Sequence, residues 1–484
     1  MEKRDYISFV LDGELINLDF RNNGELKPTT TVLNYLRSYP EHKGVKEGCA
    51  EGDCGACTVV IAEPDGSEKM KYTAVDSCLV FLPMIHGKQL ITVENLEQHV
   101  SGKTILHPVQ KAMVENYGAQ CGYCTPGIIM SMFALYKNHH LPSKEIVADA
   151  LTGNLCRCTG YQPIADAATI SCSNHGTDHF TDNEKKILAL LAQVNKSETI
   201  EIEKGEQKYF VPFTLSEALR LRKEYPGAII INGSTDTALR QTKKHEVLHK
   251  IIDLSHIAEL KHFQNTDKSI IVGAGTTIEK LRKISEKKLP AFHSLLSVFG
   301  SLQIRSLATI GGNVGSASPI GDTLPLLFAH RALITVKNNQ SERVIPIDKF
   351  ITGYRRIDLK PDELIVAIEI PFPSENEIVW SQKVSKRKDL DISTVSAAFN
   401  VKLNTDKTIG SAVLAFGGMA AKTQRAYKTE EFLVGKQWNR SNVEKAMELL
   451  YNEFTPISDA RSFADTRRLF AKNLLLKFWS ETKN

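Results

Sequence analysis

The chain has 484 residues, enough for about three domains at a usual size of roughly 150 residues each. Its hydrophobic content of 42% and charged content of 24% are ordinary for a globular protein in water. A net charge of +4 is small for this length and argues against nucleic acid as the main partner.

Targeting signals are not visible in the sequence. The first residues, Met1 to Tyr6, have no apolar segment behind their charges, so we expect no secretory signal. No apolar run approaches the ~18 residues that a membrane-spanning helix needs, so we expect no membrane span. All nine cysteines precede residue 173. Because no export signal is visible, we expect these cysteines to be reduced and mostly metal-bound, in a cytoplasmic protein.

The first 80 residues read as strands, one helix and a long loop. Residues 4–20 alternate around Asp12 and Gly13, which predicts a β-hairpin with a two-residue turn. Residues 31–39 have helical spacing and end at a proline. A strand is expected over 58–62, and Cys78 is expected to begin a buried strand or extended run.

The loop between that helix and strand carries the first cysteine set. Its members follow the spacing C-x4-C-x2-C with a distant fourth cysteine, namely Cys49, Cys54, Cys57 and Cys78. This spacing is the plant-type [2Fe–2S] ferredoxin pattern. Interspersed glycines let the backbone fold back and bring N–H donors against the sulfurs. A structural zinc site or a disulfide pair is the alternative, but zinc usually takes two separated C-x2-C knuckles, and disulfides need an oxidising compartment.

The next block is helical and carries a second cysteine set. Helices are expected near residues 108–118, 126–138 and 143–151, with a fourth after residue 159. The second set comprises Cys121, Cys124, Cys156 and Cys158. A threonine and a helix start follow each pair, and helix N-termini favour an anionic cluster. Zinc fits the C-x2-C half but not the C-x1-C half. Cys172 lies outside both sets and is interpreted as a non-ligand.

Residues 171–204 are polar and turn-rich, with one amphipathic helix expected around 185–194. His175 and His179 are four residues apart, a spacing that could suggest a metal site. We interpret this segment as a solvated linker, because turn-forming residues flank both histidines.

Three glycine-rich turns follow apolar strands in the second half of the chain. They lie at residues 232–236, 273–275 and 311–322. Such turns let the backbone approach a pyrophosphate closely, with N–H groups facing the anion. None fits the Rossmann fingerprint, since Ile278 stands where its third glycine belongs. Taken singly, each is better interpreted as an ordinary hairpin or loop.

The cysteine motifs carry a family resemblance. Cys-Gly-Tyr-Cys-Thr-Pro-Gly at 121–127 and Cys-Arg-Cys-Thr-Gly-Tyr at 156–161 resemble the iron–sulfur part of the molybdenum hydroxylases. This family includes xanthine dehydrogenases, aldehyde oxidoreductases and carbon monoxide dehydrogenases. The resemblance implies two [2Fe–2S] clusters. The first cysteine set would hold a ferredoxin-like cluster, and the second a cluster in a four-helix bundle beside the molybdenum cofactor.

The glycine-rich turns together resemble the FAD domain of the same family. The resemblance implies FAD contacts at Ile229, Ile230, Ile231, Asn232, Gly233, Ser234, Thr235, Asp236, Phe299, Thr309, Gly311, Gly312, Asn313, Asp322, Ile365 and Lys383. Phe299 would stack on the flavin ring, and residues 309–313 would contact the phosphates. Without the resemblance, Phe299 reads as core, since leucines surround it at helical spacing.

The resemblance covers nearly the whole chain and implies an α+β multidomain fold. The expected parts are a β-grasp ferredoxin-like [2Fe–2S] domain (1–92), a four-helix [2Fe–2S] domain (93–170), a linker (171–204), an α+β non-Rossmann FAD-binding domain (205–373) and a C-terminal α/β flavoprotein subdomain (374–484).

We expect no molybdopterin domain after residue 484. Iron–sulfur and FAD modules in this order resemble the small subunit of bacterial xanthine dehydrogenases, which act in purine catabolism. This implies a molybdenum-binding large subunit as partner, in a dimer of heterodimers. Electrons would pass from molybdenum through both clusters to FAD and then NAD⁺. Alternatives are the same subunit of an aldehyde or N-heterocycle hydroxylase, or a free iron–sulfur flavoprotein reductase. The sequence leaves open O₂ as acceptor.

Overall fold

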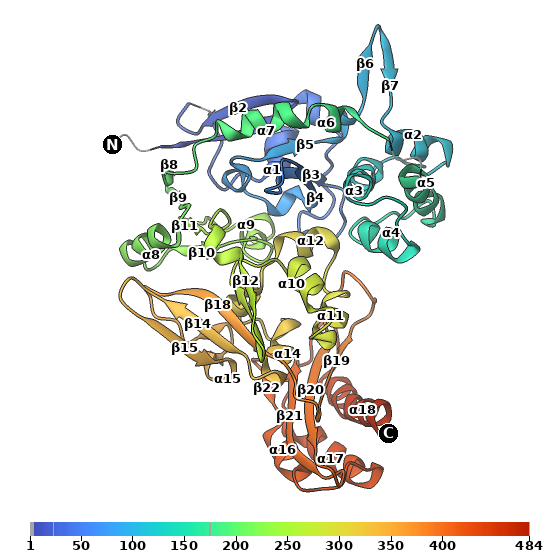
Figure 1. Ribbon diagram of the computed structural model, residues 1–484, viewed down its shortest axis with the longest axis vertical. Coiled ribbons are helices and arrows are strands. Elements are labelled where there is room, and N and C mark those ends of the chain that lie inside the picture. The colour runs from blue at the N-terminus through green and yellow to red at the C-terminus, as the bar shows by residue number, and fades with distance from the viewer. Residues whose placement is uncertain (1–3, 23, 174–175, 484) are drawn as a thin grey trace. The chain divides into compact units, whose positions relative to one another are not determined.

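The computed structural model describes residues 4–22, 24–173 and 176–483, and Figure 1 shows its elements. The chain divides into two compact units. Unit 1 comprises Met1–Leu221, Gly227–Ile257 and Ser301–Ala308. Unit 2 comprises Arg222–Pro226, Ala258–Gly300 and Thr309–Asn484. Both units mix helices with sheets, which confirms the predicted α+β multidomain class.

Unit 1 begins with a five-stranded β-grasp sheet. Its order is β2-β1-β5-β3-β4, with bounds Glu14–Asp19, Tyr6–Leu11, Gln89–Ile91, Thr58–Pro64 and Met70–Asp76. β1 and β5 are parallel, while the other neighbours are antiparallel. The predicted hairpin turn is present, with Asp12 and Gly13 both at positive φ, as a type I′ turn requires. Helix α1 (Val32–Arg37) follows and is capped by the Thr31 side chain.

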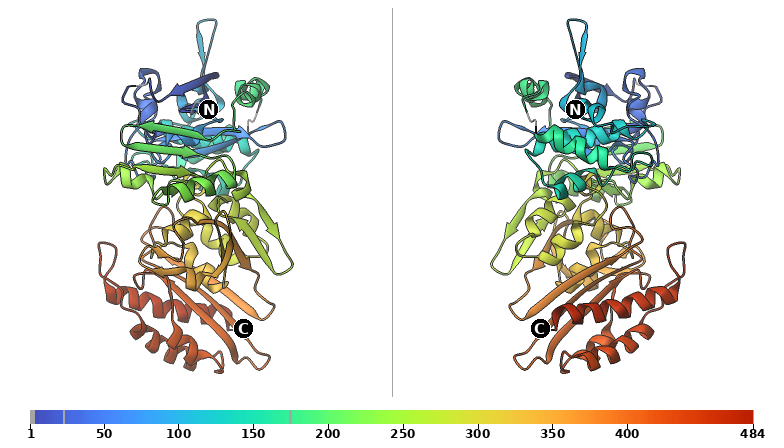
Figure 2. Two further views of the ribbon diagram at one scale, coloured as in Figure 1. Left: turned by 90° about the vertical axis from the view of Figure 1, so that its left-hand side faces the viewer. Right: turned by 90° about the vertical axis from the view of Figure 1, so that its right-hand side faces the viewer.

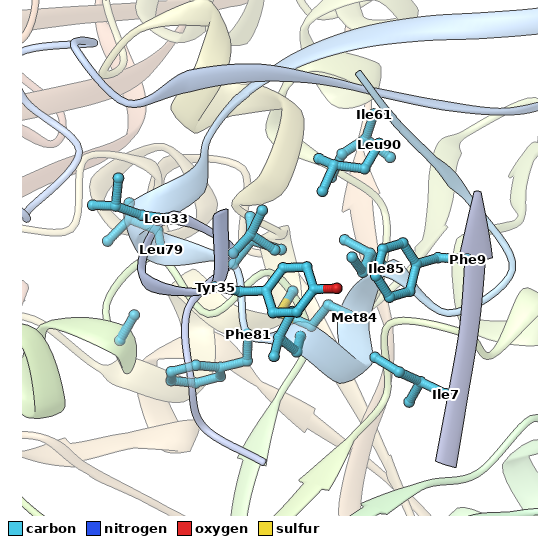
Figure 3. Close-up of a cluster of buried hydrophobic side chains, with 14 of the residues drawn as sticks. Ile7, Phe9, Leu33, Tyr35, Ile61, Leu79, Phe81, Met84, Ile85 and Leu90 are labelled. Atoms are coloured by element: carbon cyan, nitrogen blue, oxygen red, sulfur yellow. The ribbon is translucent and has the colours of Figure 1, made fainter. Parts of the chain in front are cut away.

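Alternate residues of β3 pack into two different cores, because successive strand side chains point to opposite faces. Val59 and Ile61 join the core beneath α1, where Phe9 meets Tyr35 edge to face at 5.9 Å between ring centroids. Figure 3 shows Tyr35 among the apolar side chains of this core. Val60 joins a second core formed with the helices that follow. The β-grasp sheet therefore connects the two cysteine-bearing modules of unit 1.

The predicted four-helix module is present in unit 1. Its helices are α2 (Pro108–Glu115), α3 (Thr125–Asn138), α4 (Lys144–Leu151) and α5 (Gln162–Ser173). Helix α3 is buried over most of its length and packs on β3 and β4, beside which it lies in Figure 1. An exposed hairpin of β6 (Gln98–Val100) and β7 (Lys103–Ile105) precedes α2.

The segment expected to be a solvated linker is more ordered than its composition suggested. Helix α5 continues to Ser173, and α6 (His179–Asp182) and α7 (Glu184–Ala192) follow. Phe180, Ile187 and Leu191 are buried in the core of the helical module. Three buried apolar side chains thus anchor this mainly polar segment to the helical module.

One polar contact adds to this anchoring. Asp178 caps α6 and accepts hydrogen bonds from Lys137 at 2.8 Å and from His107 at 3.0 Å. Both partners lie in or beside the helices of the four-helix module, so the contact holds the start of the segment against that module.

Unit 1 also contains a four-stranded sheet from the flavin-like half of the sequence. Its order is β10-β11-β9-β8, with bounds Ile229–Ile231, Lys250–Asp253, Gln207–Val211 and Ile200–Lys204. Its apolar side chains share the core beneath α1. The helices of this region are α8 (Leu215–Glu224), α9 (Ala238–Thr242) and α12 (Leu302–Leu307).

Unit 2 contains a five-stranded sheet, a four-stranded sheet and a two-stranded pair. The first has the order β12-β13-β18-β14-β15, with bounds Phe263–Asn265, Ser269–Gly273, Leu364–Pro371, Leu333–Lys337 and Glu342–Pro346. The second has the order β19-β20-β21-β22, with bounds Glu377–Val384, Val395–Leu403, Ile409–Gly417 and Gln424–Arg425. The remaining pair is β16 (Ile351–Gly353) with β17 (Arg356–Ile357).

Helices cover both sheets of unit 2. They are α10 (Ile278–Ser285), α11 (Pro290–Leu296), α13 (Ile310–Ser316), α14 (Thr323–Ala329), α15 (Ile347–Phe350), α16 (Tyr427–Leu433), α17 (Arg440–Glu453) and α18 (Ala464–Thr482). The last three share one apolar core with β20 and β21. Figure 2 shows these red helices beside the orange strands. No described helix is long and apolar enough to cross a membrane.

A buried histidine makes the stability of unit 2 sensitive to acid. His330 is 4% exposed, its Nδ1 lies 2.9 Å from the Pro371 carbonyl oxygen, and burial lowers its pKa to about 4. The imidazole of residue 330 therefore binds a proton near pH 6.5 in the unfolded chain but only near pH 4 in the folded chain. Between pH 7 and pH 5 the free energy of unfolding of the parent protein should fall as this histidine is protonated. We predict that the fall is about 2 kcal/mol smaller in His330→Gln. Urea unfolding of both proteins at the two pH values measures this, and equal losses would contradict it.

Candidate iron–sulfur and flavin sites

The first cysteine loop is tightly wound, and glycines make the winding possible. Gly52 and Gly55 have positive φ values of 77° and 67°, a conformation that costs glycine little. A Cβ on Gly48 would lie 2.7 Å from the Cys54 Sγ atom, so a side chain there would displace a predicted ligand. The winding also aims the N–H groups of Glu51 and Asp53 at Cys49 Sγ, at 3.4 and 3.3 Å. Donors of this kind stabilise a thiolate.

The four thiols of the first set, three from this loop and that of Cys78, meet as two pairs. Cys49 is hydrogen-bonded to Cys54, which lowers the pKa of Cys49 to about 5 and raises that of Cys54. Cys57 is hydrogen-bonded to Cys78, which lowers the pKa of Cys57 and raises that of Cys78. A [2Fe–2S] cluster needs four thiolates, two for each iron. The pairing fits that requirement. Among the described residues, no three or more His, Cys, Asp or Glu side chains are grouped so that they could hold a metal ion.

Cys78 differs from the expectation in its local structure. It lies in a 3₁₀ turn, Ser77–Leu79, directly after β4, and does not begin a strand. The turn brings the Cys78 thiol, which is 1% exposed, back towards the loop. A strand would have carried it away, because each strand residue advances ~3.3 Å.

Asp76 is a site residue that the sequence reasoning missed. Its carboxylate oxygen Oδ1 lies 3.9 Å from Cys57 Sγ. The side chain is fully buried, and this burial raises its pKa well above the usual range. The available signal was an aspartate two residues before a predicted ligand cysteine, at the end of a strand whose preceding residues Ala74 and Val75 are apolar.

The second cysteine set also meets as two pairs, and each pair joins the two halves of the motif. Cys121 is hydrogen-bonded to Cys158, which raises the pKa of Cys158. Burial and a hydrogen bond with Cys156 raise the pKa of Cys124 to about 12. The set therefore also presents two thiols for each of two irons. Cys121 and Cys158 are exposed, whereas Cys156 is buried.

Thr159 contributes to the second set. Its Oγ1 lies 3.2 Å from Cys156 Sγ. Burial opposes ionisation of Cys156, but hydrogen bonds from Thr159 and from backbone N–H groups outweigh it and lower the pKa of that thiol. The threonine after the second pair therefore stabilises a thiolate.

Cys172 lies outside both sets, as the sequence indicated, but it is not in a turn. It is fully buried in α5, and this burial raises the pKa of its thiol. We predict that Cys172→Ser leaves the iron content unchanged and costs about 1–3 kcal/mol of stability, because a hydroxyl replaces a thiol in an apolar core. Iron analysis and thermal unfolding measure the two effects. A loss of half the iron would show that Cys172 is a ligand.

Of the two histidines in the following segment, only His179 lies in the described part of the chain. His175 lies outside the described residues. His179 Nε2 lies 3.0 Å from the Asn95 carbonyl oxygen, and its ring packs on Phe180 at 4.1 Å between centroids. His179 is thus engaged in packing the segment onto unit 1.

The first group of expected FAD residues, Ile229–Asp236, lies in unit 1. It forms β10 and the turn after it. A Cβ on Gly233 would lie 1.8 Å from the Leu307 carbonyl oxygen, so only glycine fits there. Ser234 has a positive φ of 54°, and its hydroxyl donates to the Leu79 carbonyl oxygen, next to Cys78. This turn therefore contacts the element that carries the fourth cysteine of the first set.

The second group, Thr309 to Asn313, lies in unit 2. Thr309 caps α13 by accepting a hydrogen bond from the Gly312 N–H at 3.1 Å. The Gly311 N–H donates to the Ala274 carbonyl oxygen at 2.9 Å, which joins two of the glycine-rich turns. A Cβ on Gly311 would lie 2.5 Å from that oxygen, whereas one on Gly312 would meet only Thr309 Oγ1, at 3.0 Å. Gly311 is needed for packing, and Gly312 faces more open space.

Asp322 and Lys383 form a buried ion pair in the same unit. Lys383 Nζ lies 2.9 Å from Asp322 Oδ2, and their side chains are 3% and 8% exposed. Ser393 Oγ donates to Asp322 Oδ1 at 2.5 Å. Lys383 also donates to the Val298 carbonyl oxygen at 3.2 Å. The pair thus joins three segments expected at the flavin.

Two expected FAD residues lie near these segments. Phe299, which follows Val298, is half-buried and does not belong to the buried core. Ile365, on β18, lies beside α13, because its Cδ1 would be 3.4 Å from a Cβ on Gly315. The other expected FAD residues all belong to unit 2, namely Phe299, Thr309, Gly311, Gly312, Asn313, Asp322, Ile365 and Lys383, while Ile229–Asp236 belong to unit 1.

Three segments match described domain families. Residues 92–169 match the [2Fe–2S] binding domain. Residues 201–373 match the FAD binding domain in molybdopterin dehydrogenase, and residues 380–482 match the C-terminal domain of the CO dehydrogenase flavoprotein. Together with the cysteine pairs, these matches define an iron–sulfur flavoprotein.

Several curated relatives are xanthine dehydrogenases. The chain is 32% identical to that of Emericella nidulans, over 93% of this chain and 36% of that protein. It is 30% identical to the xanthine dehydrogenase/oxidase of Gallus gallus, over 94% of this chain and 39% of that protein. The chain therefore spans little more than a third of the length of these relatives.

Two solved structures share part of the fold. A Cu,Mo-CO dehydrogenase chain matches 57% of this chain and 97% of its own length, at 24% identity and a TM-score of 0.53. A quinoline 2-oxidoreductase chain from Pseudomonas putida 86 matches 58% of this chain and 98% of its own, at 22% identity and a TM-score of 0.53. The chain belongs to the molybdenum hydroxylase family. Within this family it corresponds to the iron–sulfur and FAD-binding part.

Proposed function

We propose that the chain is the electron-transfer subunit of a xanthine dehydrogenase. In this proposal electrons from hypoxanthine or xanthine, oxidised at a molybdenum cofactor on a partner chain, pass through two [2Fe–2S] clusters to FAD and then to NAD⁺. The observation that carries the proposal is the pairing of eight cysteines, two by two, in two modules beside an FAD-binding family match. Xanthine dehydrogenases among the relatives support the substrate.

The surface around the second cysteine set supports a partner chain. Cys121 and Cys158 are exposed. The neighbouring apolar side chains Tyr117, Tyr123 and Tyr161 are 85%, 51% and 45% exposed. Exposed apolar side chains around a reactive site are typical of a surface that another protein covers. We propose that the molybdenum-binding large subunit covers it, in a dimer of heterodimers.

The state of the cysteines supports a reducing compartment. None of the nine cysteines, all of which lie in the described chain, forms a disulfide. Free thiols in this number are typical of the cytoplasm, where they remain available as ligands. We propose a cytoplasmic location.

Co-expression with a molybdenum-binding large subunit tests this function. We expect the two chains to co-purify and to reduce NAD⁺ when xanthine is added. Faster turnover with an aldehyde or an N-heterocycle such as quinoline would replace the purine assignment with one of those substrates. If turnover required O₂ and did not occur with NAD⁺, then O₂ would replace NAD⁺ as the proposed electron acceptor. A chain that purifies alone and reduces its clusters directly from NADH would instead be a free reductase.

A further inference from the structure

A buried polar cluster lies between the two cysteine-bearing modules of unit 1. Its members are Thr58, Ser131, Asn154 and Gln303, each at most 3% exposed. They come from β3, from α3, from the loop before Cys156 and from α12. Buried polar groups are costly unless they are hydrogen-bonded, so such a cluster restricts its members to one arrangement.

Asn154 is the centre of this cluster. Its Nδ2 donates to the Gly55 carbonyl oxygen at 3.0 Å and to Thr58 Oγ1 at 3.1 Å. Its Oδ1 accepts from Ser131 Oγ at 2.6 Å and from Gln303 Nε2 at 3.1 Å. The amide thus uses both donors and both lone pairs. Because a carbonyl oxygen can only accept, the Gly55 contact also determines which way the amide points.

Three glycines allow the backbones around Asn154 to touch. A Cβ on Gly55 would lie 2.2 Å from the Gly153 carbonyl oxygen, and one on Gly127 would lie 2.1 Å from the Gly55 carbonyl oxygen. A Cβ on Gly153 would lie 2.0 Å from Gln303 Oε1. No side chain fits at any of the three positions without displacing backbone or the buried Gln303.

The cluster adjoins ligands of both sets. Gly55 lies between Cys54 and Cys57 in the first cysteine loop, and Asn154 lies two residues before Cys156. The Leu155 N–H donates directly to the Cys54 carbonyl oxygen at 3.0 Å. Movement of either loop relative to the other would therefore break contacts to Asn154.

We propose that Asn154 is a positioning residue that sets the separation of the two iron–sulfur centres. The proposal rests on the proposed function, because it requires both cysteine sets to hold clusters. The ordinary alternative is a buried amide that only stabilises the fold. The two differ in one respect, since only a positioning residue changes the interaction between the clusters while each cluster stays intact.

Low-temperature EPR of the fully reduced protein measures that interaction. Two nearby reduced clusters split or relax each other's signals through a magnetic coupling that falls steeply with distance. The side chain of leucine is similar in shape to that of asparagine but offers no hydrogen bonds. We expect Asn154→Leu to keep its iron and both signals and to lose part of the coupling. Asn400→Leu is the matched control, because Asn400 is equally buried in unit 2.

Gly127→Ala decides the question if Asn154→Leu fails to fold. Alanine favours the helix at this position, so its cost would come from the contact with Gly55. We expect full iron and weakened coupling, with Gly227→Ala unchanged because a Cβ there meets nothing within 4 Å. The inference would be overturned if an iron-replete Asn154→Leu or Gly127→Ala variant showed the same coupling as the parent protein. It would also be overturned if the parent protein showed two EPR signals with no coupling between them. A parent with one signal would instead overturn the proposed function.

Discussion

Gly312→Val is expected to contain normal iron and little FAD. By the family resemblance, Gly312 belongs to the turn that faces the FAD phosphates. A valine there would keep the backbone N–H groups away from the anion, and no rotamer restores the approach. The fold should tolerate the change, because a Cβ at Gly312 would meet only Thr309 Oγ1, at 3.0 Å. Iron analysis and the flavin absorbance of the purified protein measure the two contents.

The choice of glycine matters for this experiment. Gly311→Val would be uninformative, since its Cβ would lie 2.5 Å from the Ala274 carbonyl oxygen and would disturb packing. Gly353→Val is a suitable control in the same unit, because a Cβ there makes only ordinary contacts at 3.7 Å. With the proposed molybdenum-binding partner present, substrate is expected to reduce the proposed clusters of Gly312→Val as in the parent, while the proposed NAD⁺ reduction falls to background. Full FAD and normal turnover would place the dinucleotide elsewhere.

Cys57→Ser is expected to lose about half of the iron, that of one [2Fe–2S] cluster. Cys57 is 2% exposed and pairs with Cys78, so its replacement removes one of the four thiols of the first set. The cysteines of the helical module pair only with one another and should retain their cluster. Iron analysis with EPR of the reduced variant should show one of the two parent signals, and Cys172→Ser should show both. Loss of both signals would mean that the two sites do not assemble independently.

The restrictive spacing of the eight cysteines predicts them as ligands from the sequence alone, but it does not predict how they pair. Cys121 and Cys124 are close in sequence, yet each pairs with a cysteine of the other half of the motif. The pairing depends on how α3 and α5 approach each other, which is a tertiary property. Cys78 shows the same limit, since the apolar run after it favoured a strand or extended run and the chain forms a 3₁₀ turn there.

Residues that act across long sequence separations escaped the sequence reasoning. Gln303 lies 149 residues from Asn154, and no local pattern relates the two. Asp178 lies in a polar stretch that resembled a linker, but its carboxylate binds His107 and Lys137 and anchors the segment. For the flavin residues, the family resemblance supplied the candidates. The structure then adds the contact between Asp322 and Lys383.

Anaerobic purification followed by metal, sulfide and flavin analysis with EPR tests the central claim most directly. Eight paired thiols predict about four irons and four sulfides for each chain, in two distinct reduced signals. The FAD-binding family match predicts one FAD in addition. Stoichiometric zinc with only half of that iron would contradict the proposed second cluster, and absence of flavin would contradict the proposed electron path through FAD to NAD⁺.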